Sequence, residues 1–305
     1  MSPSSSAIRA KALEIGFDLC GIAPVEGFPE LSFITEWLAR GYAGDMAWMT
    51  RTADKRADVR HVVPGARSVI VTGTLYNTDR PYSSDLSPDI AHISRYAWGD
   101  DYHDVLKQRL DALLEWMRGE SDEPFDARAY VDTGPVQERV YAQYAGLGWI
   151  GKNTCLINPE WGSWLFLGEI ISTLPLEADT QGLEQCGNCT RCLEACPTGA
   201  LVEPGVLDSN RCLSYLTIEL RTAIPDEHRR ALGSQARRDR GQRDSGGAWH
   251  AGRRQGSPFA SQNQYRSGHR GCEDGRLWRH RRDRPGALPG SPRLQRRRWQ
   301  SRRQG

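Results

Sequence analysis

The chain has 305 residues, 40 Lys and Arg against 38 Asp and Glu, and 38% hydrophobic residues. No apolar run approaches the roughly 20 residues that span a bilayer, which excludes an integral membrane protein. The first 235 residues carry a net charge of −12, whereas residues 236–305 carry +14. Because the N-terminus has neither the basic nor the apolar segment of a secretory signal, we expect a cytoplasmic protein.

Hydrophobic spacing predicts mixed helices and strands along the first domain. The expected helices cover residues 5–17, 29–49, 101–118 and 135–144. The expected strands cover residues 18–25, 68–74 and 127–131, and a hairpin is expected from residues 155–157 and 163–174. Gly16 should end the first helix, and Pro135 should open the last one. The elements lack a regular βαβ order, so the sequence predicts an α+β fold.

Asp132 stands where the expected strand at residues 127–131 ends and a helix is about to begin. Reactive side chains project from such strand ends, whereas an Asp beside a helix N-terminus is also favoured by the helix dipole. The residues alone leave both interpretations open. His103 follows Asp101 and Tyr102, and we interpret it as a polar residue at a helix start rather than a metal ligand.

The segment from Gly146 to Gly151 matches G-x-G-x-x-G. A dinucleotide-binding site needs a strand before this motif and a helix after it. Here a helix is expected before it and a strand after it, so the order is reversed. The sequence therefore gives no support to nicotinamide cofactor binding.

The strongest motif is C-x2-C-x2-C-x3-C-P, formed by Cys186, Cys189, Cys192 and Cys196. This spacing is typical of bacterial ferredoxins, in which the fourth Cys binds a second 4Fe–4S cluster. A zinc site would instead use C-x2-C pairs separated by a longer loop. Cys212 brings the local set to five cysteines, fewer than two clusters require. Either one cluster is present or ligands are missing.

The last seventy residues form a third region. Residues 236–305 contain 19 Arg and only three Leu, with no Val, Ile or Met. Too little apolar area is available to offset chain entropy, so we expect a disordered or out-of-frame tail. A nucleic-acid-binding arm is the alternative. The predicted domains are thus residues 1–175, an incomplete ferredoxin-like domain at 176–235, and the Arg-rich tail.

Several segments together resemble the epoxyqueuosine reductase family, a cobalamin-dependent iron–sulfur family of tRNA modification. The resemblance covers about residues 5–235. The matching segments are Ser94-Arg95-Tyr96, Asp101-Tyr102-His103, Tyr130 to Pro135 with Glu138-Arg139, Gly148 to Asn153, the cysteine run, and Cys212 to Glu219.

The resemblance implies reduction of epoxyqueuosine to queuosine at the tRNA wobble position, by a monomer. Electrons from an external donor such as flavodoxin or ferredoxin would pass through 4Fe–4S clusters to cobalamin in the first domain. Asp132 would contact the cofactor and act as the acid that protonates the departing epoxide oxygen. The other implied corrin contacts are Arg56, Arg95, Asn153 and Ser214. The implied cluster ligands are Cys186, Cys189 and Cys192 for one cluster, and Cys196 and Cys212 for the other.

The chain departs from the family pattern after Gln235. The family places a second motif, C-x2-C-x3-C-P-W-N, shortly after this position, and a tRNA-binding region follows it. Their loss would remove ligands of both clusters. Two alternatives therefore remain: another corrinoid or iron–sulfur reductase acting on a small molecule, as in reductive dehalogenases, or an inactive remnant or electron carrier.

Overall fold

The computed structural model describes residues 2–81, 94–229 and 231. The tail predicted at residues 236–305 lies outside the described residues. Within the described residues, no helix is long and apolar enough to cross a membrane.

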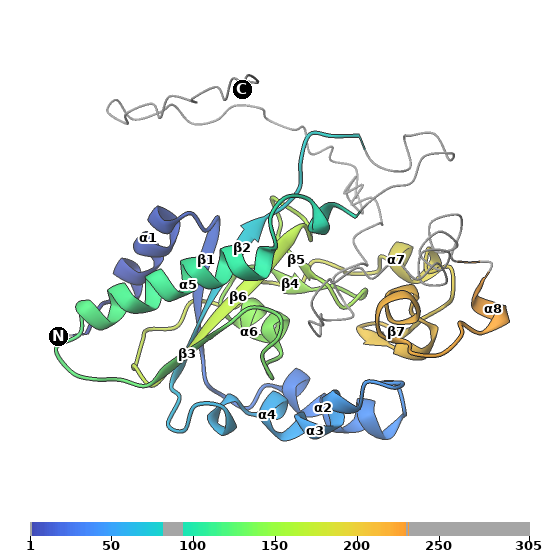
Figure 1. Cartoon of the computed structure of the whole chain (residues 1–305), viewed down its shortest axis with the longest axis horizontal. Coiled ribbons are helices and arrows are strands. Elements are labelled where there is room, and N and C mark those ends of the chain that lie inside the picture. The colour runs from blue at the N-terminus through green and yellow to red at the C-terminus, as the bar shows by residue number, and fades with distance from the viewer. Residues whose placement is uncertain (1, 82–93, 230, 232–305) are drawn as a thin grey trace, which may run out of the picture. The chain divides into compact units, whose positions relative to one another are not determined.

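A four-stranded antiparallel sheet forms the centre of the described chain (Figure 1). In spatial order its strands are β1 (Leu19–Pro24), β2 (Ser68–Leu75), β6 (Leu165–Ser172) and β3 (Ala127–Tyr130). Glu169 in β6 stands opposite Val71 in β2 and Tyr130 in β3. The absence of parallel pairs in this sheet agrees with the predicted α+β class.

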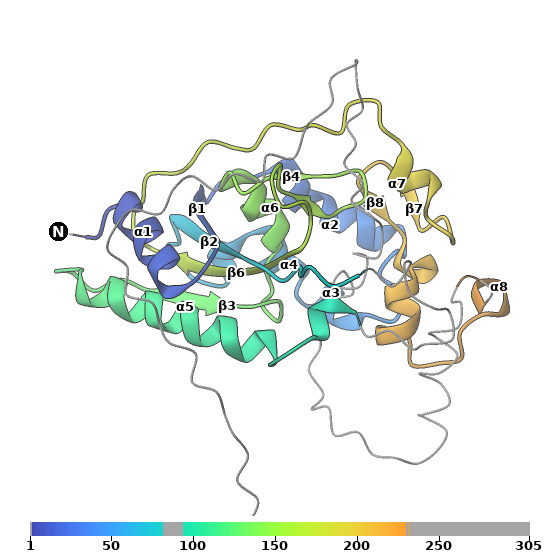
Figure 2. The ribbon, with the colours of Figure 1, turned by 90° about the horizontal axis from the view of Figure 1, so that it is seen from above.

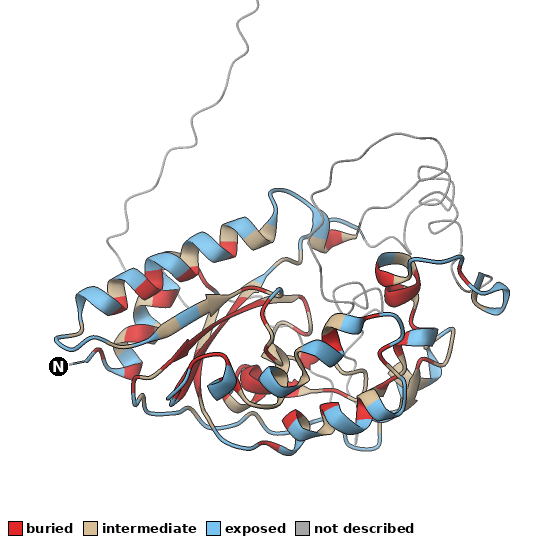
Figure 3. Ribbon diagram, turned by 60° about the horizontal axis from the view of Figure 1, so that its bottom comes forward, coloured by how far each residue is buried: buried red, intermediate tan, exposed pale blue. Residues whose placement is uncertain are grey.

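Helices cover both faces of the sheet. On one face, α1 (Ser5–Ile15) and α5 (Tyr102–Gly119) pack Ile8 and Leu110 against Ile70 of β2 (Figures 1 and 2). On the other face, α6 (Glu138–Tyr144) packs Tyr141 against Val71. The buried residues follow the inner sides of the helices and the sheet, as the apolar spacing predicted (Figure 3). Gly16 ends α1 in a left-handed conformation with φ +111°, which confirms the predicted stop.

The prediction of a single helix at residues 29–49 is wrong. Two helices occupy this stretch, α2 (Pro29–Ala39) and α3 (Ala47–Arg51). Gly41 and Gly44 lie between them with φ +71° and +55°, a left-handed backbone that ends a helix. A Cβ at Gly44 would lie 2.5 Å from the Tyr215 hydroxyl oxygen, so a close contact also requires glycine here. The chain then continues through α4 (Ala53–Ala57) and a short 3-10 helix, Val59–His61.

Two further local predictions need correction. The helix predicted to open at Pro135 begins at Glu138 instead. The predicted hairpin also does not form, because β5 (Leu156–Ile157) pairs with β4 (Trp149–Ile150), while β6 pairs with β2 and β3. Only the turn between them is as expected, with a bridge that joins Asn158 to Gly162.

The cysteine-rich unit contains short elements. They are α7 (Arg191–Glu194), β7 (Leu201–Glu203), β8 (Val206–Leu207), a 3-10 turn Ser209–Arg211, a π-helix Tyr215–Glu219, and α8 (Asp226–Arg229). This unit packs on α2 in one apolar cluster that joins Ile34 and Trp37 to Leu207 and Tyr215. The Trp37 Nε1 atom donates a hydrogen bond to the Leu207 carbonyl at 2.7 Å. The domain boundary at residue 175 stays a prediction, and residues before and after it pack in one apolar cluster.

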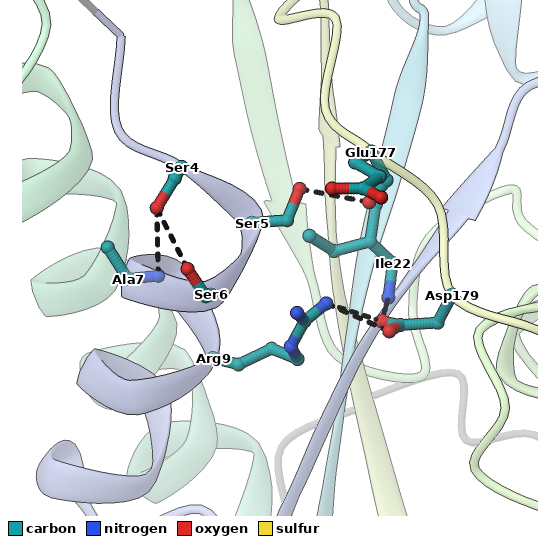
Figure 4. A network of polar contacts seen from close by, with 8 residues as sticks. All are labelled: Ser4, Ser5, Ser6, Ala7, Arg9, Ile22, Glu177 and Asp179. Carbon is teal, nitrogen blue, oxygen red and sulfur yellow. Dashed lines mark hydrogen bonds and ion pairs between the residues drawn. The ribbon is translucent and has the colours of Figure 1, made fainter.

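Residues 173–185 link β6 to the cysteine run and pass along the edge strand β1 (Figure 2). Arg9 of α1 forms an ion pair with Asp179 at 2.8 Å (Figure 4). The Asp179 N–H donates a hydrogen bond to the Ile22 carbonyl oxygen at 2.8 Å. In return, the Asp179 side chain accepts a hydrogen bond from the Ile22 N–H at 2.8 Å. Ser5 also holds this linker through the Glu177 carbonyl at 2.9 Å.

The glycine motif at Gly146–Gly151 lies under this linker. A Cβ at Gly146 would lie 2.7 Å from the Thr180 carbonyl oxygen. A Cβ at Gly182 would lie 2.3 Å from the Gly148 carbonyl oxygen. The motif follows α6, as the sequence predicted, and contains β4, while the strand expected after it corresponds to β5. Its glycines allow two backbones to approach closely.

Candidate active site

Asp132 lies in the loop that follows β3. Its φ is +56°, in the left-handed region that non-glycine residues seldom adopt. The Tyr102 hydroxyl donates a hydrogen bond to Asp132 Oδ2 at 3.0 Å, and His103 Nε2 lies 3.5 Å from the same oxygen. The Asp132 side chain is only 9% exposed. Such strain in a partly buried polar loop is characteristic of functional sites.

The first turn of α5 supplies both partners of Asp132. Asp101 caps the helix by accepting the His103 N–H at 2.9 Å, and it also contacts His103 Nδ1 at 2.7 Å. The nearby Asp132 carboxylate raises the pKa of His103, burial opposes this, and Asp101 adds to the rise. Burial and the Asp132 charge raise the pKa of Tyr102, so its hydroxyl remains a donor. His103 is at a helix start as predicted, but its contact with Asp132 was not foreseen.

An aromatic wall closes this side of the site. The Tyr102 ring stacks on Phe166 with centroids 4.2 Å apart, and Phe166 contacts Tyr76 at 4.4 Å. Burial raises the pKa of Tyr76, with the neighbouring Cys155 adding to the rise. The stacking holds the Tyr102 ring, whose hydroxyl bonds to Asp132, against an apolar surface, and low exposure strengthens the electrostatic interactions of Asp132.

Arg56 of α4 holds the loop that carries Asp132. Its guanidinium donates to the carbonyl oxygens of Val136 at 3.1 Å and Gly134 at 3.3 Å. It also lies 5.1 Å from the Trp48 ring centroid. Burial lowers the pKa of Arg56, and nearby carboxylates oppose this, Glu138 most strongly. The contact predicted between Arg56 and a corrin stays a prediction. In the structure, Arg56 supports the loop through its hydrogen bonds to Gly134 and Val136.

Two carboxyl groups near Asp132 had no role in the sequence analysis, where Glu138 appeared only within a matching segment. Glu169 is 1% exposed, and its Oε2 has no hydrogen-bond partner among the described residues. Burial raises the pKa of Glu169, and the charges of Glu138 and Asp132 raise it further. Burial likewise raises the pKa of Glu138 to about 7, with Asp132 adding to the rise. A charged residue inside the apolar segment Leu165–Ser172 is the signal that could have found Glu169.

Arg95 lies on a different loop. Its guanidinium donates to the carbonyl oxygens of Thr78 at 2.8 Å and Pro81 at 3.1 Å, and lies 5.5 Å from the Trp164 ring centroid. It also bonds to Asn77 and Arg80. These contacts fix residues 77–81, and the predicted corrin contact of Arg95 stays a prediction.

Asn153 lies in a turn next to polar groups without a hydrogen-bond partner among the described residues, and Ser214 lies at the start of a π-helix. Asn153 Oδ1 accepts the Cys155 N–H at 3.2 Å, and the adjacent Thr154 has φ +65°. Among the described residues, the buried Thr154 Oγ1 and Trp149 Nε1 have no hydrogen-bond partner. Ser214 is buried at the start of the π-helix, a rare element often found at functional sites. Because buried polar groups are nearly always paired, the segment around Thr154 and Trp149 fits a site that receives a polar ligand.

The five cysteines proposed as cluster ligands are all at least partly buried. Cys186, Cys189, Cys192 and Cys196 are partly buried, and Cys212 is buried. Burial alone would raise the pKa of Cys196, but backbone N–H groups from Leu201, Thr198 and Ala200 lower it below its usual value. Such donors stabilise a thiolate, which is the form that binds metal. No His, Cys, Asp or Glu group in the described part of the chain converges on a single metal ion.

Family profiles match two separate segments of the chain. The epoxyqueuosine reductase profile (QueG, DUF1730) matches residues 56–133, and a 4Fe-4S double cluster binding domain matches residues 185–237. The epoxyqueuosine reductase of Gloeobacter violaceus is 50% identical over 223 residues, covering 72% of this chain and 68% of that protein. The chain belongs to the epoxyqueuosine reductase family.

Other members of the epoxyqueuosine reductase family match in the same way. The Synechocystis enzyme is 50% identical over 67% of this chain and 70% of its own length. A crystal structure of an epoxyqueuosine reductase with an epoxyqueuosine-modified tRNA stem loop is 33% identical, with a TM-score of 0.66. A Bacillus subtilis structure, in which an aspartate catalytic loop is swung out of the active site, is 32% identical with a TM-score of 0.62. Each match covers 74% of this chain and 60% of the solved chain.

Proposed function

We propose that this chain reduces epoxyqueuosine to queuosine at the wobble position of tRNA, the last step of queuosine biosynthesis. The observation that carries the proposal is the Asp132 loop. It has a left-handed backbone, is held by Arg56, and presents a carboxyl group that bonds to Tyr102. The family membership supports the proposal, and an aspartate loop is catalytic in the related Bacillus subtilis enzyme.

Asp132 acts as the general acid in this proposal. Opening an epoxide places negative charge on its oxygen, and an alkoxide is a poor leaving group unless a positioned acid protonates it. The strained backbone and the Tyr102 hydrogen bond orient the Asp132 carboxyl. The Tyr102 ring is held against the apolar surface of Phe166, and low exposure strengthens the electrostatic interactions of Asp132.

The chain's residues fit the family's cofactors. Cobalamin, when bound, would supply the reducing electrons for the epoxide. Asn153, Ser214, Arg56 and Arg95 are the residues proposed to hold it, and the unpartnered Thr154 and Trp149 groups support a polar ligand nearby. The proposed cluster ligands are Cys186, Cys189, Cys192, Cys196 and Cys212. Their number and spacing match one 4Fe–4S cluster and part of a second, in keeping with the matched double cluster domain.

The proposed partners are tRNA carrying epoxyqueuosine and an electron donor such as flavodoxin or ferredoxin. The tRNA stem loop in the related crystal structure supports the first partner. The proposed setting is the cytoplasm, with the protein as a monomer. The net charge of −12 before residue 236 opposes phosphate binding, so the affinity for tRNA must come from positively charged residues in spite of this net charge.

The substrate that the chain reduces distinguishes this proposal from the alternative, a reductase that acts on small molecules. Purified chain would be reconstituted anaerobically with iron, sulfide and cobalamin, both as it is and with the family's second cysteine motif placed after Gln235. We expect the chain with the added motif to convert epoxyqueuosine tRNA to queuosine tRNA, measured by mass spectrometry of digested nucleosides, and to leave a halogenated phenol unchanged. Dehalogenation without tRNA reduction would overturn the proposal.

A further inference from the structure

The loop that carries Asp132 makes a strained turn between β3 and α6. Asp132 has φ +56°, and across it the Thr133 N–H donates a hydrogen bond to the Val131 carbonyl oxygen at 2.5 Å. Such a three-residue turn with a positive φ is rare and strained. Strained backbone persists only where the surrounding structure holds it in place. The contacts that hold this loop therefore decide where the Asp132 carboxyl lies.

Gln137 holds the end of the loop, directly before α6. It occupies the N-cap position of α6, yet its side chain makes no capping hydrogen bond. The Gln137 Nε2 atom instead donates two hydrogen bonds, to the carbonyl oxygens of Leu31 at 3.0 Å and Arg56 at 3.1 Å. The Arg56 carbonyl is among the last of α4, and the last carbonyls of a helix lack a partner within it. One side chain thus ties the loop to both α2 and α4.

Arg56 holds the same loop from the opposite direction. Its guanidinium donates to the carbonyl oxygens of Gly134 and Val136 inside the loop. The guanidinium is itself fixed, because its Nε atom donates a hydrogen bond to the Thr52 hydroxyl at 3.1 Å. The Arg56 side chain therefore holds the loop backbone, while the Gln137 side chain holds the Arg56 backbone. Loss of either side chain would release the loop from α4.

We propose that Gln137 is a positioning residue for epoxide reduction: through Arg56 and the loop backbone it keeps the Asp132 carboxyl beside the Tyr102 hydroxyl. This inference rests on the proposed function, in which Asp132 is the acid. An amide side chain does not titrate, so Gln137 acts through the position of Asp132 and delivers no proton itself. Without its two hydrogen bonds, the strained turn relaxes and the acid is held less well in its reactive position.

The restraint on the loop can be measured without cofactors or substrate. Hydrogen–deuterium exchange of the full chain, read by mass spectrometry, reports how often the backbone N–H groups of residues 131–136 open. Gln137→Met keeps the side-chain length but removes both donors, so we expect exchange in this segment to become at least about tenfold faster.

Gln143→Met is the matched control for this exchange measurement. Gln143 is a buried glutamine of α6 whose side chain bonds to Glu30 and to the Ile150 N–H instead of to the Asp132 loop. We expect exchange in residues 131–136 to stay as in the unaltered chain. Unchanged exchange in Gln137→Met, or equal acceleration in both variants, would overturn the proposal. The result does not depend on whether the chain reduces epoxyqueuosine.

A double-mutant cycle separates positioning from a merely structural role. In the chain with the second cysteine motif added, Gln137→Met should lower kcat by about tenfold to a hundredfold and leave KM for epoxyqueuosine tRNA unchanged, because a misplaced acid slows the chemical step. In the Asp132→Asn background, the same change should have no further effect on the residual rate, since the acid that Gln137 positions is gone. Losses that multiply in the double variant would contradict the proposal.

Gln137→Glu tests whether the two donors matter rather than the shape of the side chain. Its carboxylate has the same size as the amide but cannot donate to the carbonyl oxygens of Leu31 and Arg56. We expect this variant to lose kcat as Gln137→Met does, and a rate equal to that of the unaltered chain would overturn the proposal. Absence of turnover in the parent chain would count against the proposed function instead, and the exchange measurement would still decide this inference.

Discussion

The Nζ atom of Lys152 lies 2.7 Å from the carbonyl oxygen of Gly187, in the first loop of the cysteine run. The same ammonium group bonds to the Cys189 carbonyl at 3.1 Å. The Lys152 backbone carbonyl accepts the Gly205 N–H at 2.9 Å from the other side of this unit. Lys152, the second residue after β4, therefore positions the segment that carries two proposed cluster ligands.

Lys152→Met should weaken the hold on the cluster without removing a ligand. Hydrogen bonds from a charged donor contribute about 1.5–3 kcal/mol, and 1.4 kcal/mol corresponds to a factor of ten. We expect at least about tenfold faster loss of iron to a chelator after anaerobic reconstitution. Lys107→Met is the control, because Lys107 forms only an exposed ion pair with Asp111. Equal rates in the two variants would show that Lys152 does not stabilise the cluster.

Asp132→Asn should abolish epoxide reduction while leaving cobalamin binding and the cluster spectrum intact. Asn keeps the shape of Asp and can still donate a hydrogen bond, but it cannot deliver a proton. Losing a general acid costs about 10²–10⁴-fold in rate. The measurement uses the chain with the second cysteine motif added, so that electron supply does not limit turnover. Near-normal turnover would identify solvent or another residue as the acid.

Gly182→Ala tests the close contact between the linker and the glycine motif. The added Cβ would lie 2.3 Å from the Gly148 carbonyl oxygen, and backbone must move to accommodate it. We expect the free energy of unfolding to fall by about 1–3 kcal/mol, measured by urea denaturation. Gly27→Ala is the matched control, because its Cβ meets nothing within 4 Å. Similar stability in both variants would mean that the linker relaxes freely.

The raised pKa values of Glu138 and Glu169 predict how stability depends on pH. The pKa of Glu138 rises from 4.5 to about 7 in the folded chain, and that of Glu169 also rises, so the native state binds more protons than the unfolded state. Stability is therefore greatest below about pH 4.5 for these groups and falls as pH rises through about 7. We expect a loss of roughly 1–3 kcal/mol from this source. Glu169→Gln should flatten the curve, and an unchanged slope would contradict the assigned shifts.

Deleting residues 236–305 should remove most tRNA binding at low salt. Nineteen Arg attract phosphate without reading sequence, so this binding should weaken steeply with salt and ignore the anticodon. Cobalamin binding should be unchanged. Filter binding with tRNAs that carry correct and incorrect anticodons measures both properties. A preference for the correct anticodon at physiological salt, lost on deletion, would show that the tail is a recognition element.

Local signals in the sequence predicted the ends of some elements and failed at others. Gly16 ends α1 as expected because a left-handed glycine satisfies the last carbonyl groups of a helix. The break after α2 was missed because the apolar spacing continues past Gly41 and Gly44, although the left-handed backbone of these glycines ends the helix. The expected hairpin failed because β6 finds its partners in β2 and β3, which are distant in sequence. Such pairing depends on the whole sheet and cannot be read from neighbouring residues.

The candidate site was predicted in part. Asp132 stood out at a strand end, and the structure places it in a strained, partly buried loop. Tyr102 was given no role and His103 was interpreted only as a helix-start residue, because nothing local to α5 reveals that its first turn meets the loop after β3. Glu169 was hidden in an apolar strand, and its importance depends on burial that only the folded sheet provides.

Trp37 and Tyr215 lie in the same apolar cluster, although they come from opposite halves of the described chain. A fragment that ended at residue 175 would leave the apolar face of α2 open to water. The fate of the cysteine-rich unit therefore affects the whole molecule. A polypeptide that failed to acquire its iron would present this face to chaperones and proteases, so cofactor loading would act as quality control during maturation.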